Sequence, residues 1–221
     1  MVTAPPWNWS RDCCLPAERS GPPAKTRDYR QTARAAAVEE TRRRIAEAFS
    51  ECWREQWFDE ITLEDVARRA GVSVRTVIRQ FGGKEGLIAG FVHYVSPQVE
   101  ARRTVAPGDV DAAIERLFEN YEADGDATIR GLAQEQRLPA LAPMILAGRA
   151  GHRHIIGVNF ARWIEPLPPA DREKAIDALV IATDVYTWKL LRRDAGRTVS
   201  EAKATMRRLV DTILAGLAPT G

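Results

Sequence analysis

Five basic side chains lie between residues 68 and 84, and no acidic residue interrupts them. They are Arg68, Arg69, Arg75, Arg79 and Lys84. Guanidinium and ammonium groups can pair with nucleic-acid phosphates, and an arginine can also bond a base edge. The whole chain is nearly neutral, with 32 Lys and Arg against 30 Asp and Glu, so this positive charge is local. The pattern therefore favours nucleic-acid binding at this segment.

The same segment predicts two short helices joined by a tight turn. Thr62 can cap the first helix with Asp65 completing a capping box, and Gly71 can end it in the left-handed conformation. Ser73 can cap the second helix, which Gly82 ends. About three residues then separate the helices, the length of a helix-turn-helix connection. The alternative interpretation is an ordinary pair of surface helices whose arginines meet only solvent.

Residues from about 33 to 92 resemble the N-terminal domain of TetR-type transcriptional regulators. A long first helix precedes the pattern IT-x-x-x-VA-x-x-AGVS-x-x-T-x-x-x-x-F-x-x-KE-x-L. The residues that match it are Ile61, Thr62, Val66, Ala67, Ala70, Gly71, Val72, Ser73, Thr76, Phe81, Lys84, Glu85 and Leu87. The resemblance implies an all-α fold, with a three-helix DNA-binding domain of the helix-turn-helix type followed by a helical domain for ligand binding and dimerisation.

The resemblance also assigns DNA contacts to individual positions. Phosphates would be held by Thr62, Thr76 and Lys84, and base edges would face Val74, Arg75 and Arg79. The full set of predicted DNA-binding residues is Thr62, Ser73, Val74, Arg75, Thr76, Arg79, Gln80 and Lys84. The implied partner is a double-stranded DNA operator.

Two positions depart from the family pattern. Gln80 stands where the family usually has an aromatic residue, often a tyrosine that holds a phosphate, and Ile78 is often aromatic too. Gln80 can bond a phosphate or an adenine edge instead. Gly83 replaces the usual Ser or Pro before Lys84, which weakens the start of the next helix by about a few tenths of a kcal/mol. Gln80 motivates a second hypothesis, a helical dimeric interaction protein with weak or nonspecific DNA binding, controlled by a protein partner.

Proline and glycine divide the rest of the chain. We expect a flexible N-terminal arm over residues 1–27, the DNA-binding domain over 28–90 and the second domain over 91–221. The arm is followed by a basic stretch from Arg27 to Arg44, which either reaches the DNA or is a solvated tail. No strand pattern occurs, and helices are expected near 84–103, 109–123, 126–136, 139–163, 169–194 and 199–217. Pro97 and Pro143 should kink or shorten theirs.

The last two helices predict a homodimer. The segment 170–194 is apolar on more than one face, and Thr198 with Glu201 can begin a final helix with one apolar stripe. Two such helices from each of two chains would form a four-helix interface, and a purely internal core is the alternative. The predicted interface residues are Ile176, Val180, Thr183, Thr187, Trp188, Leu190, Leu191, Met206, Leu209, Val210 and Ile213.

Among the helices between about residues 109 and 190 we expect a pocket for a small-molecule effector. Its predicted lining is aromatic with polar anchors, and the residues are Phe118, Tyr121, His154, Trp163 and Tyr186. Ordinary core or surface positions are the alternative for each. An effector bound there would release a repressor from a palindromic operator.

Other function classes find no support in the sequence. His152 and His154 are two apart and do not share a helix face, so we expect no metal site, and no residue nominates a catalytic role or a cofactor. The three cysteines, two of them adjacent at Cys13 and Cys14, indicate free thiols rather than a disulfide framework. With no apolar run able to span a bilayer and no signal-peptide core, we expect no membrane association and a cytoplasmic protein.

Overall fold

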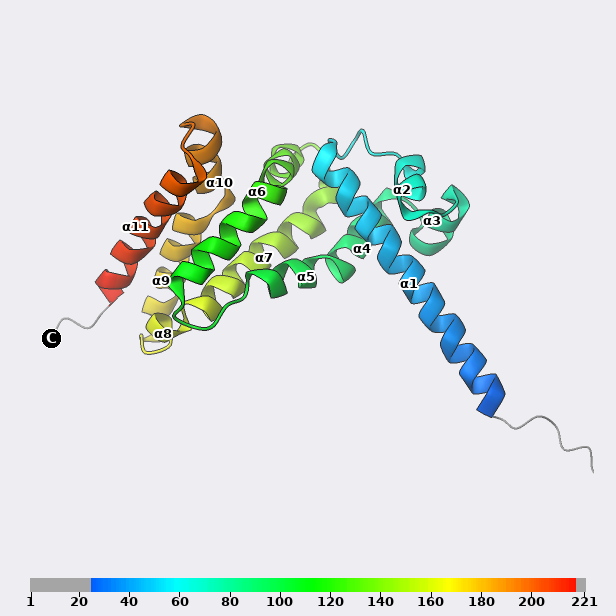
Figure 1. Cartoon of the computed structure of the whole chain (residues 1–221), viewed down its shortest axis with the longest axis horizontal. Coiled ribbons are helices and arrows are strands. Elements are labelled where there is room, and N and C mark those ends of the chain that lie inside the picture. Colours follow the sequence, from blue (N-terminus) through cyan, green and yellow to red (C-terminus); the bar gives the residue numbers. More distant parts are fainter. Residues whose placement is uncertain (1–24, 218–221) are drawn as a thin grey trace, which may run out of the picture. The chain divides into compact units, whose positions relative to one another are not determined.

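The structure, a computed structural model, describes residues 25–217, with side chains from residue 31 onward. The predicted N-terminal arm lies outside the described residues except for the first residues of α1, as do Cys13, Cys14 and the side chain of Arg27. The chain divides into two compact units, residues 1–39 and 40–221, and the following description concerns the second. Every regular element between residues 25 and 217 is helical, so the predicted all-α class is confirmed (Figure 1).

The helices follow one another with short connections. In chain order they are α1 (Lys25–Glu55), α2 (Leu63–Ala70), α3 (Val74–Phe81), α4 (Lys84–Tyr94), α5 (Ser96–Arg103), α6 (Val110–Gln134), the short turn η1 (Pro139–Leu141), α7 (Ala142–Asn159), α8 (Ala161–Ile164), α9 (Pro169–Thr183), α10 (Val185–Lys189), the π-helical turn η2 (Leu190–Asp194) and α11 (Val199–Leu217).

One hydrophobic core joins the end of α1 to α2, α3 and α4. Phe49 of α1 is fully buried there and meets the rings of Phe58 and Phe91 edge to face, with centroids 6.3 and 6.4 Å apart. Val66 of α2 and Val77 of α3 are also fully buried in this core. The core continues into residues of α6, η1 and α7. The small N-terminal helices and these C-terminal helices therefore share one continuous hydrophobic core.

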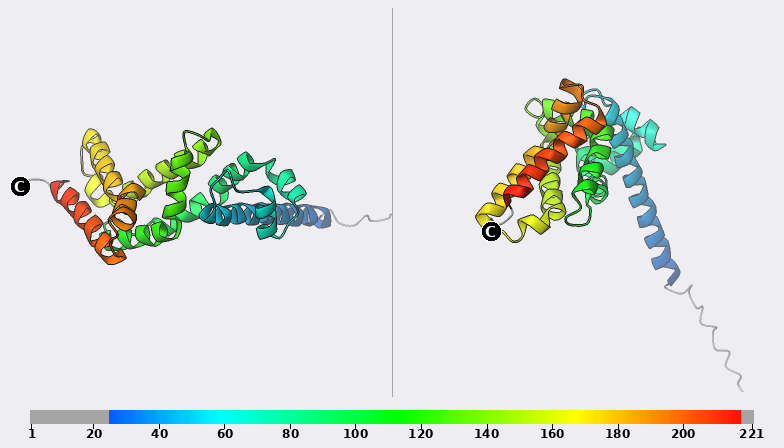
Figure 2. Two further views of the ribbon diagram at one scale, coloured as in Figure 1. Left: turned by 90° about the horizontal axis from the view of Figure 1, so that it is seen from above. Right: turned by 60° about the vertical axis from the view of Figure 1, so that its left-hand side comes forward.

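A second core lies among α6, α9, α10 and α11. Trp188, Phe118 and Met206 are its largest fully buried side chains, together with Phe160 and Leu179. Helices α9 and α11 pack side by side, as the two views of Figure 2 show. The final helix begins as expected, because Thr198 Oγ1 accepts from Glu201 N at 3.2 Å while Glu201 Oε2 accepts from Thr198 N at 2.8 Å.

Helix α6 crosses a position where the sequence predicts a break. Gly125 lies in its middle, and α6 runs unbroken through it from Val110 to Gln134. A Cβ at Gly125 would lie 2.6 Å from Trp188 Cζ3, so this glycine makes room for an indole. The residue is needed for packing rather than for ending a helix.

The predicted helix over 169–194 is also wrong as a single element. The chain leaves the helical conformation at Asp184 (φ −66°, ψ 155°), whose Oδ1 accepts from Tyr186 N at 2.8 Å and so caps α10. The apolar residues on several faces of this segment therefore belong to two helices with different directions. The predicted effect of Pro97 is confirmed, because α4 and α5 meet at Val95, two residues before it.

The loop between α1 and α2 is anchored by three other segments through Asp59. Its carboxylate accepts from Gln134 Nε2 at 2.7 Å and from Arg137 Nη2 at 2.8 Å, and its carbonyl accepts from Lys84 Nζ at 3.3 Å. The Arg137 hydrogen bond is the main reason why the pKa of Asp59 is lowered. Gln134 Oε1 also accepts from Phe58 N at 3.2 Å. The side chain of Gln134 at the end of α6 therefore makes hydrogen bonds to two consecutive residues of this loop.

Within residues 25–217, no helix is both long and apolar enough to cross a membrane. No group of three or more His, Cys, Asp or Glu side chains in the described part could hold a metal ion. Cys52 is buried and free, and its burial raises the pKa of its thiol.

Candidate nucleic-acid interface

The turn between α2 and α3 has the geometry that the sequence predicts. Thr62 caps α2, because its Oγ1 accepts from Asp65 N at 3.1 Å and donates to Asp65 Oδ2 at 2.6 Å. Gly71 ends the helix in the left-handed conformation (φ 64°). The N–H of Val72 then donates to Ala67 O at 3.0 Å, which satisfies one of the last carbonyls of α2.

Helix α3 begins at Ser73 and ends at Gly82. Ser73 Oγ accepts from Thr76 N at 3.2 Å and lies 3.0 Å from Thr76 Oγ1. Two hydroxyls therefore stand at the N-terminal end of α3, where backbone N–H groups and the helix dipole favour an anion. Gly82 has φ 78°, a conformation that a glycine adopts without strain.

Two arginines and an isoleucine form the exposed stripe of α3. Arg75 and Arg79 are exposed and one turn apart, and Ile78, with 48% of its surface exposed, lies between them. Val74, expected at a base edge, is half-buried and packs against the N-terminal core, and its base contact stays a prediction. Ile78 is not among the predicted contacts, although its spacing of three from Arg75 places it on this face. Gln80 is half-buried.

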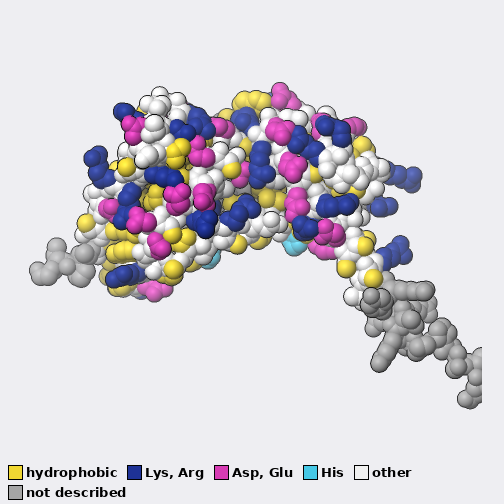
Figure 3. All heavy atoms as spheres, viewed as in Figure 1, with side chains coloured by type: hydrophobic (Ala, Val, Ile, Leu, Met, Phe, Trp, Pro, Cys, Tyr) yellow, Lys and Arg dark blue, Asp and Glu magenta, His cyan; other side chains and the backbone are white. Residues whose placement is uncertain are grey.

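The local positive charge is smaller than the sequence count. Arg68 pairs with the helix-capping carboxylate of Asp65 (Nη2–Oδ1 2.7 Å), and Arg69 pairs with Glu55 on α1. Among the basic residues of segment 68–84, the arginines of α3 have no acidic partner in the described structure, so they carry the free positive charge. In Figure 3 basic side chains project at the edge of the molecule where α3 lies.

Lys84 is bonded to the loop between α1 and α2. Its Nζ donates to the carbonyls of Phe58 at 2.5 Å and Asp59 at 3.3 Å, and it lies 4.6 Å from the centroid of the Phe58 ring. Burial lowers the pKa of this ammonium group. In this conformation its hydrogen bonds hold the α1–α2 loop, and the phosphate contact that the resemblance implies stays a prediction.

Helix α3 is fixed in place by a close contact with α4. A Cβ at Gly90 would lie 2.5 Å from Phe81 Cε1, and one at Gly86 would lie 1.7 Å from the Phe81 carbonyl oxygen. Only glycine fits at position 86, where the neighbour is backbone, and a side chain at position 90 would have to displace the Phe81 ring. The end of α3 therefore rests directly on the backbone of α4, and the guanidinium carbon of Arg42 on α1 lies 5.4 Å from the Phe81 ring centroid.

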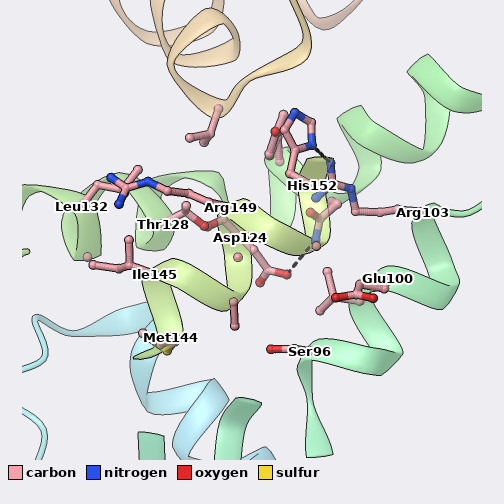
Figure 4. Close-up of a pocket in the computed structure, with 18 of the residues that line it drawn as sticks. Ser96, Glu100, Arg103, Asp124, Thr128, Leu132, Met144, Ile145, Arg149 and His152 are labelled. Carbon is pink, nitrogen blue, oxygen red and sulfur yellow. Dashed lines mark hydrogen bonds between the residues drawn. The ribbon is translucent and has the colours of Figure 1, made fainter. Parts of the chain in front are cut away.

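A cavity of about 260 Å³ lies next to the DNA-binding head, the name used here for α1 to α4. It is lined by α1, α4, α5, α6, α7 and the start of α10 (Figure 4). Of the predicted effector residues, Tyr121 and Tyr186 line it. The others do not, because Phe118 is fully buried in the second core, His154 is exposed on α7, and Trp163 borders a separate surface cavity near Val110.

Sequence reasoning missed the polar residues of the cavity wall. Arg103 and His152 line it and are both buried, with Arg103 Nη2 at 2.7 Å from His152 Nδ1. The two lie 49 residues apart in the chain, and no local pattern links them. Tyr121 Oη donates to Thr183 O at 3.0 Å beside them, and burial raises the pKa of this tyrosine to about 12.

Part of the predicted dimer interface belongs to the chain's own core. Four of its residues are fully or almost fully buried within a single chain, namely Thr183, Trp188, Met206 and Val210. Those that remain accessible in part are Ile176, Val180, Thr187, Leu191 and Ile213, and the exposed ones are Leu190 and Leu209. An apolar stripe on a helix predicts burial, but it does not distinguish burial against the same chain from burial against a second one.

Residues 45–90 match the family of bacterial regulatory proteins called the tetR family. No curated protein sequence matches this chain. The matched segment contains the end of α1 and all of α2 and α3, which are the helices that build the geometry described above.

Solved structures share the fold along most of the chain. A transcriptional regulator from Rhodococcus sp. Rha1 superposes with a TM-score of 0.62 at 19% identity, covering 79% of this chain and 96% of that one. A tetR-family transcriptional regulator from Streptomyces coelicolor gives 0.58 at 19% identity, covering 81% and 80%. Salmonella enterica GusR gives 0.58 at 21% identity, covering 80% and 96%. Residues 45–90 therefore carry the DNA-binding domain of the tetR family, and the chain as a whole has the fold of these solved transcriptional regulators.

Proposed function

We propose that the protein is a homodimeric transcriptional repressor that binds a palindromic DNA operator through α3 and is released by a small molecule. The observation that carries the proposal is the exposed stripe of Arg75, Ile78 and Arg79 on the second helix of a helix-turn-helix, with no acidic partner for either arginine among the described residues.

In this proposal α3 enters the major groove. Arg75 and Arg79 are placed to donate to the O6 and N7 atoms of guanine, and Ile78 between them can contact a thymine methyl group. The hydroxyls of Thr62, Ser73 and Thr76 stand at the N-terminal ends of α2 and α3 and would face phosphates. Gln80 is the remaining polar side chain near this surface and would bond a phosphate or an adenine.

A dimer would use the exposed apolar side chains of the C-terminal helices. Ile181 on α9 is 70% exposed and Leu209 on α11 is 44% exposed, and these two helices pack against each other. Large apolar side chains exposed on neighbouring helices are typical of an interface. Two heads held about 34–36 Å apart would then meet successive turns of the operator.

Release by an effector is supported by the position of the cavity. Helix α4 carries Phe91, which lines the cavity, and also Gly86 and Gly90, on which Phe81 of α3 rests. A molecule that moved Phe91 would therefore shift the support of the recognition helix. Such a ligand would bind more tightly to a conformation in which the spacing of the two heads does not match the operator. The loss in free energy of DNA binding would then be at most the difference between the ligand's binding free energies in the two conformations.

The test is selection of bound sequences from a random DNA duplex pool at physiological salt. The wild-type protein should enrich one palindromic motif, and Arg75→Ala with Arg79→Ala together should lose it. Arg68→Ala is the matched control, because this arginine is exposed but paired with Asp65, and it should keep the motif.

Two results would overturn the proposal. Enrichment of a motif that the double variant retains would remove α3 from base recognition. No enrichment by the wild-type protein would instead favour the helical interaction protein controlled by a protein partner, and binding partners would then be sought.

A further inference from the structure

The charged side chains of the cavity differ in whether they have a partner of opposite charge. Arg54 Nε lies 2.5 Å from Asp124 Oδ1, and Arg149 makes two hydrogen bonds to Glu135, at 2.6 and 2.7 Å. Arg103 forms no ion pair with any described residue. It is therefore the one arginine lining this cavity whose charge the described structure does not balance.

Arg103 is also the most deeply buried of the three. Only 8% of its surface is exposed, and its Nε has no hydrogen-bond partner in the described structure. Its guanidinium carbon lies 5.5 Å from the centroid of the Tyr121 ring. A guanidinium group stays charged at any ordinary pH, so burial without a counter-ion costs stability that loss of a proton cannot relieve.

His152, the nearest polar neighbour, cannot supply the missing negative charge. Arginine only donates hydrogen bonds, so His152 Nδ1 must accept from Arg103 Nη2 and the ring proton must be on Nε2. Nε2 then donates to Thr183 Oγ1 at 3.2 Å, and this hydroxyl donates to Leu179 O at 2.7 Å. Burial, followed by the charge of Arg103, lowers the pKa of His152 to about 3, so the ring is neutral.

We infer that the cavity binds a compact, largely apolar carboxylic acid in its ionised form, with the carboxylate paired to Arg103. Planar carboxylates match the guanidinium fork, and the mostly apolar wall, which includes Val99, Ile145 and Val185, suits the remainder of such a molecule. The volume of 260 Å³ is just below the range of about 300–1,000 Å³ common for drug-sized ligands, which favours a compact ligand. The inference rests on the proposed effector role of this cavity.

The acidic residues of the wall do not contradict an anionic ligand. Asp124 is paired with Arg54, and Asp184 is held as the cap of α10 by Tyr186 N. Glu100 is the remaining one, and Figure 4 draws it on α5, the helix that also ends at Arg103. A Cβ at Gly151 would lie 2.5 Å from Glu100 Oε1, so the carboxylate lies close over that glycine. Glu100 is only half-buried and keeps contact with water, whereas Arg103 is buried.

Glu100 supports the opposing interpretation, that the cavity binds a cationic ligand. The two interpretations predict opposite changes in ligand affinity when Glu100 is replaced. Replacement of Glu100 by Gln removes a negative charge from the wall. It should therefore strengthen the binding of an anion and weaken the binding of a cation. Arg103→Met should do the reverse.

The experiment compares ligands of one shape and different charge with the purified full chain and no DNA. The probes are 2-naphthoate, 2-naphthamide and 2-naphthylmethylammonium, with octanoate, octanamide and octylammonium as a flexible set. Binding is measured by the shift in melting temperature and by calorimetry at pH 7.5. In at least one set the carboxylate should bind more tightly than both analogues. Arg103→Met should then weaken that carboxylate about ten- to a hundredfold, the usual value of a hydrogen-bonded charge pair, and leave the amide unaffected.

Two controls separate this from general damage to the fold. Arg149→Met removes another arginine of the same wall, one that Glu135 already neutralises, and should keep the preference for the carboxylate. Arg103→Met without ligand should melt at the wild-type temperature or above, because it removes an unpaired buried charge. Arg103→Lys, which keeps the charge and loses the fork, should bind the carboxylate with intermediate affinity.

The inference is overturned if no carboxylate binds more tightly than its amide and amine, or if Glu100→Gln weakens carboxylate binding. A preference for the ammonium probes that Glu100→Gln abolishes would assign the site to cations. Because DNA is absent, failure here leaves the proposed operator binding intact, and failure of the sequence selection leaves this result intact.

Discussion

Gly125 of α6 lies directly against the indole of Trp188 on α10, and a Cβ at position 125 would lie 2.6 and 2.7 Å from two carbons of that ring. Trp188 is fully buried, and its Nε1 donates to Glu122 Oε1 at 2.8 Å, one turn before Gly125 on the same helix. The indole is therefore held against α6 at two places, by this hydrogen bond and by the close approach at Gly125.

We expect Gly125→Ala to destabilise the protein by about 1–3 kcal/mol, the usual cost of overpacking a close-packed core. Gly157 is the matched control, because it also lies inside a helix but a Cβ added there would meet no atom within 4 Å. Gly157→Ala should stabilise by about 0.5–1 kcal/mol through the lower entropy of the unfolded chain. Urea unfolding of both variants checks the two signs, and equal effects would contradict the packing role of Gly125.

Arg79→Ala should cost about 1–3 kcal/mol of binding to the selected operator and relax the base preference at one position of each half-site. The reason is that Arg79 is exposed and free of acidic partners beside Ile78 in the described structure. Ile78→Asn should relax a neighbouring position, with loss of a thymine preference. Titration of single-base operator variants measures both effects, and an unchanged base preference in Arg79→Ala would remove this arginine from base recognition.

Lys84→Met should act on folding rather than on DNA affinity. The variant loses two hydrogen bonds from an ammonium group to the carbonyls of Phe58 and Asp59, and we expect about 1–3 kcal/mol less stability. The slope of binding against salt concentration should stay at the wild-type value. A slope smaller by about one would instead establish a phosphate contact at this residue, as the family resemblance implies. Arg68→Met, at an exposed site, is the control for stability.

Stability should fall between pH 7.5 and 5.5 because of His152. Its pKa is about 3 in the folded protein against 6.5 for a free histidine, so below pH 6.5 the unfolded chain takes up a proton that the folded chain does not. This contribution is fully present above pH 6.5 and is lost as the pH falls, by about 1.4 kcal/mol per unit. His152→Asn should reduce the loss over this interval, whereas the exposed His154→Gln should retain it. Urea unfolding at both pH values provides the comparison.

The proposed dimer should depend on exposed residues and not on the buried ones that the sequence nominates. Leu209→Glu and Ile181→Glu place a charge on side chains that are 44% and 70% exposed, so each chain should still fold. Light scattering should then give the mass of a monomer. Leu146→Glu, on α7 and 61% exposed, is the control and should remain a dimer. A dimer in all three variants would place the interface elsewhere.

The helix-turn-helix can be predicted from the sequence because its signals are local. The caps at Thr62 and Ser73 and the left-handed Gly71 fix the ends of α2 and α3 through bonds between residues three or four apart, and the structure has each of them. The predicted effect of Pro97 belongs to the same class.

Sequence-based prediction fails where a distant residue decides the outcome. Gly125 suggests a break in a helix because nothing near it in the sequence reveals Trp188. Trp188 suggests a dimer interface because an apolar stripe predicts burial but does not show whether the same chain or a second chain covers it. Arg103 and His152 escape prediction for the same reason, since their contact forms only when α5 packs on α7. The charges of Arg68 and Arg69 look free in the sequence, although Asp65 and Glu55 neutralise them.

The anchoring of Asp59 has a consequence for the exchange of amide hydrogens. Connections between helices normally open locally, at little cost in free energy, and their amides exchange early. Here the amide of Phe58 donates to the side chain of Gln134, and the carbonyls of Phe58 and Asp59 accept from Lys84. This loop should thus open only together with the ends of α4 and α6, as one cooperative unit. A change at Asp59 would then loosen the head and the second domain at once, although Asp59 is placed at neither the predicted DNA contacts nor the cavity wall.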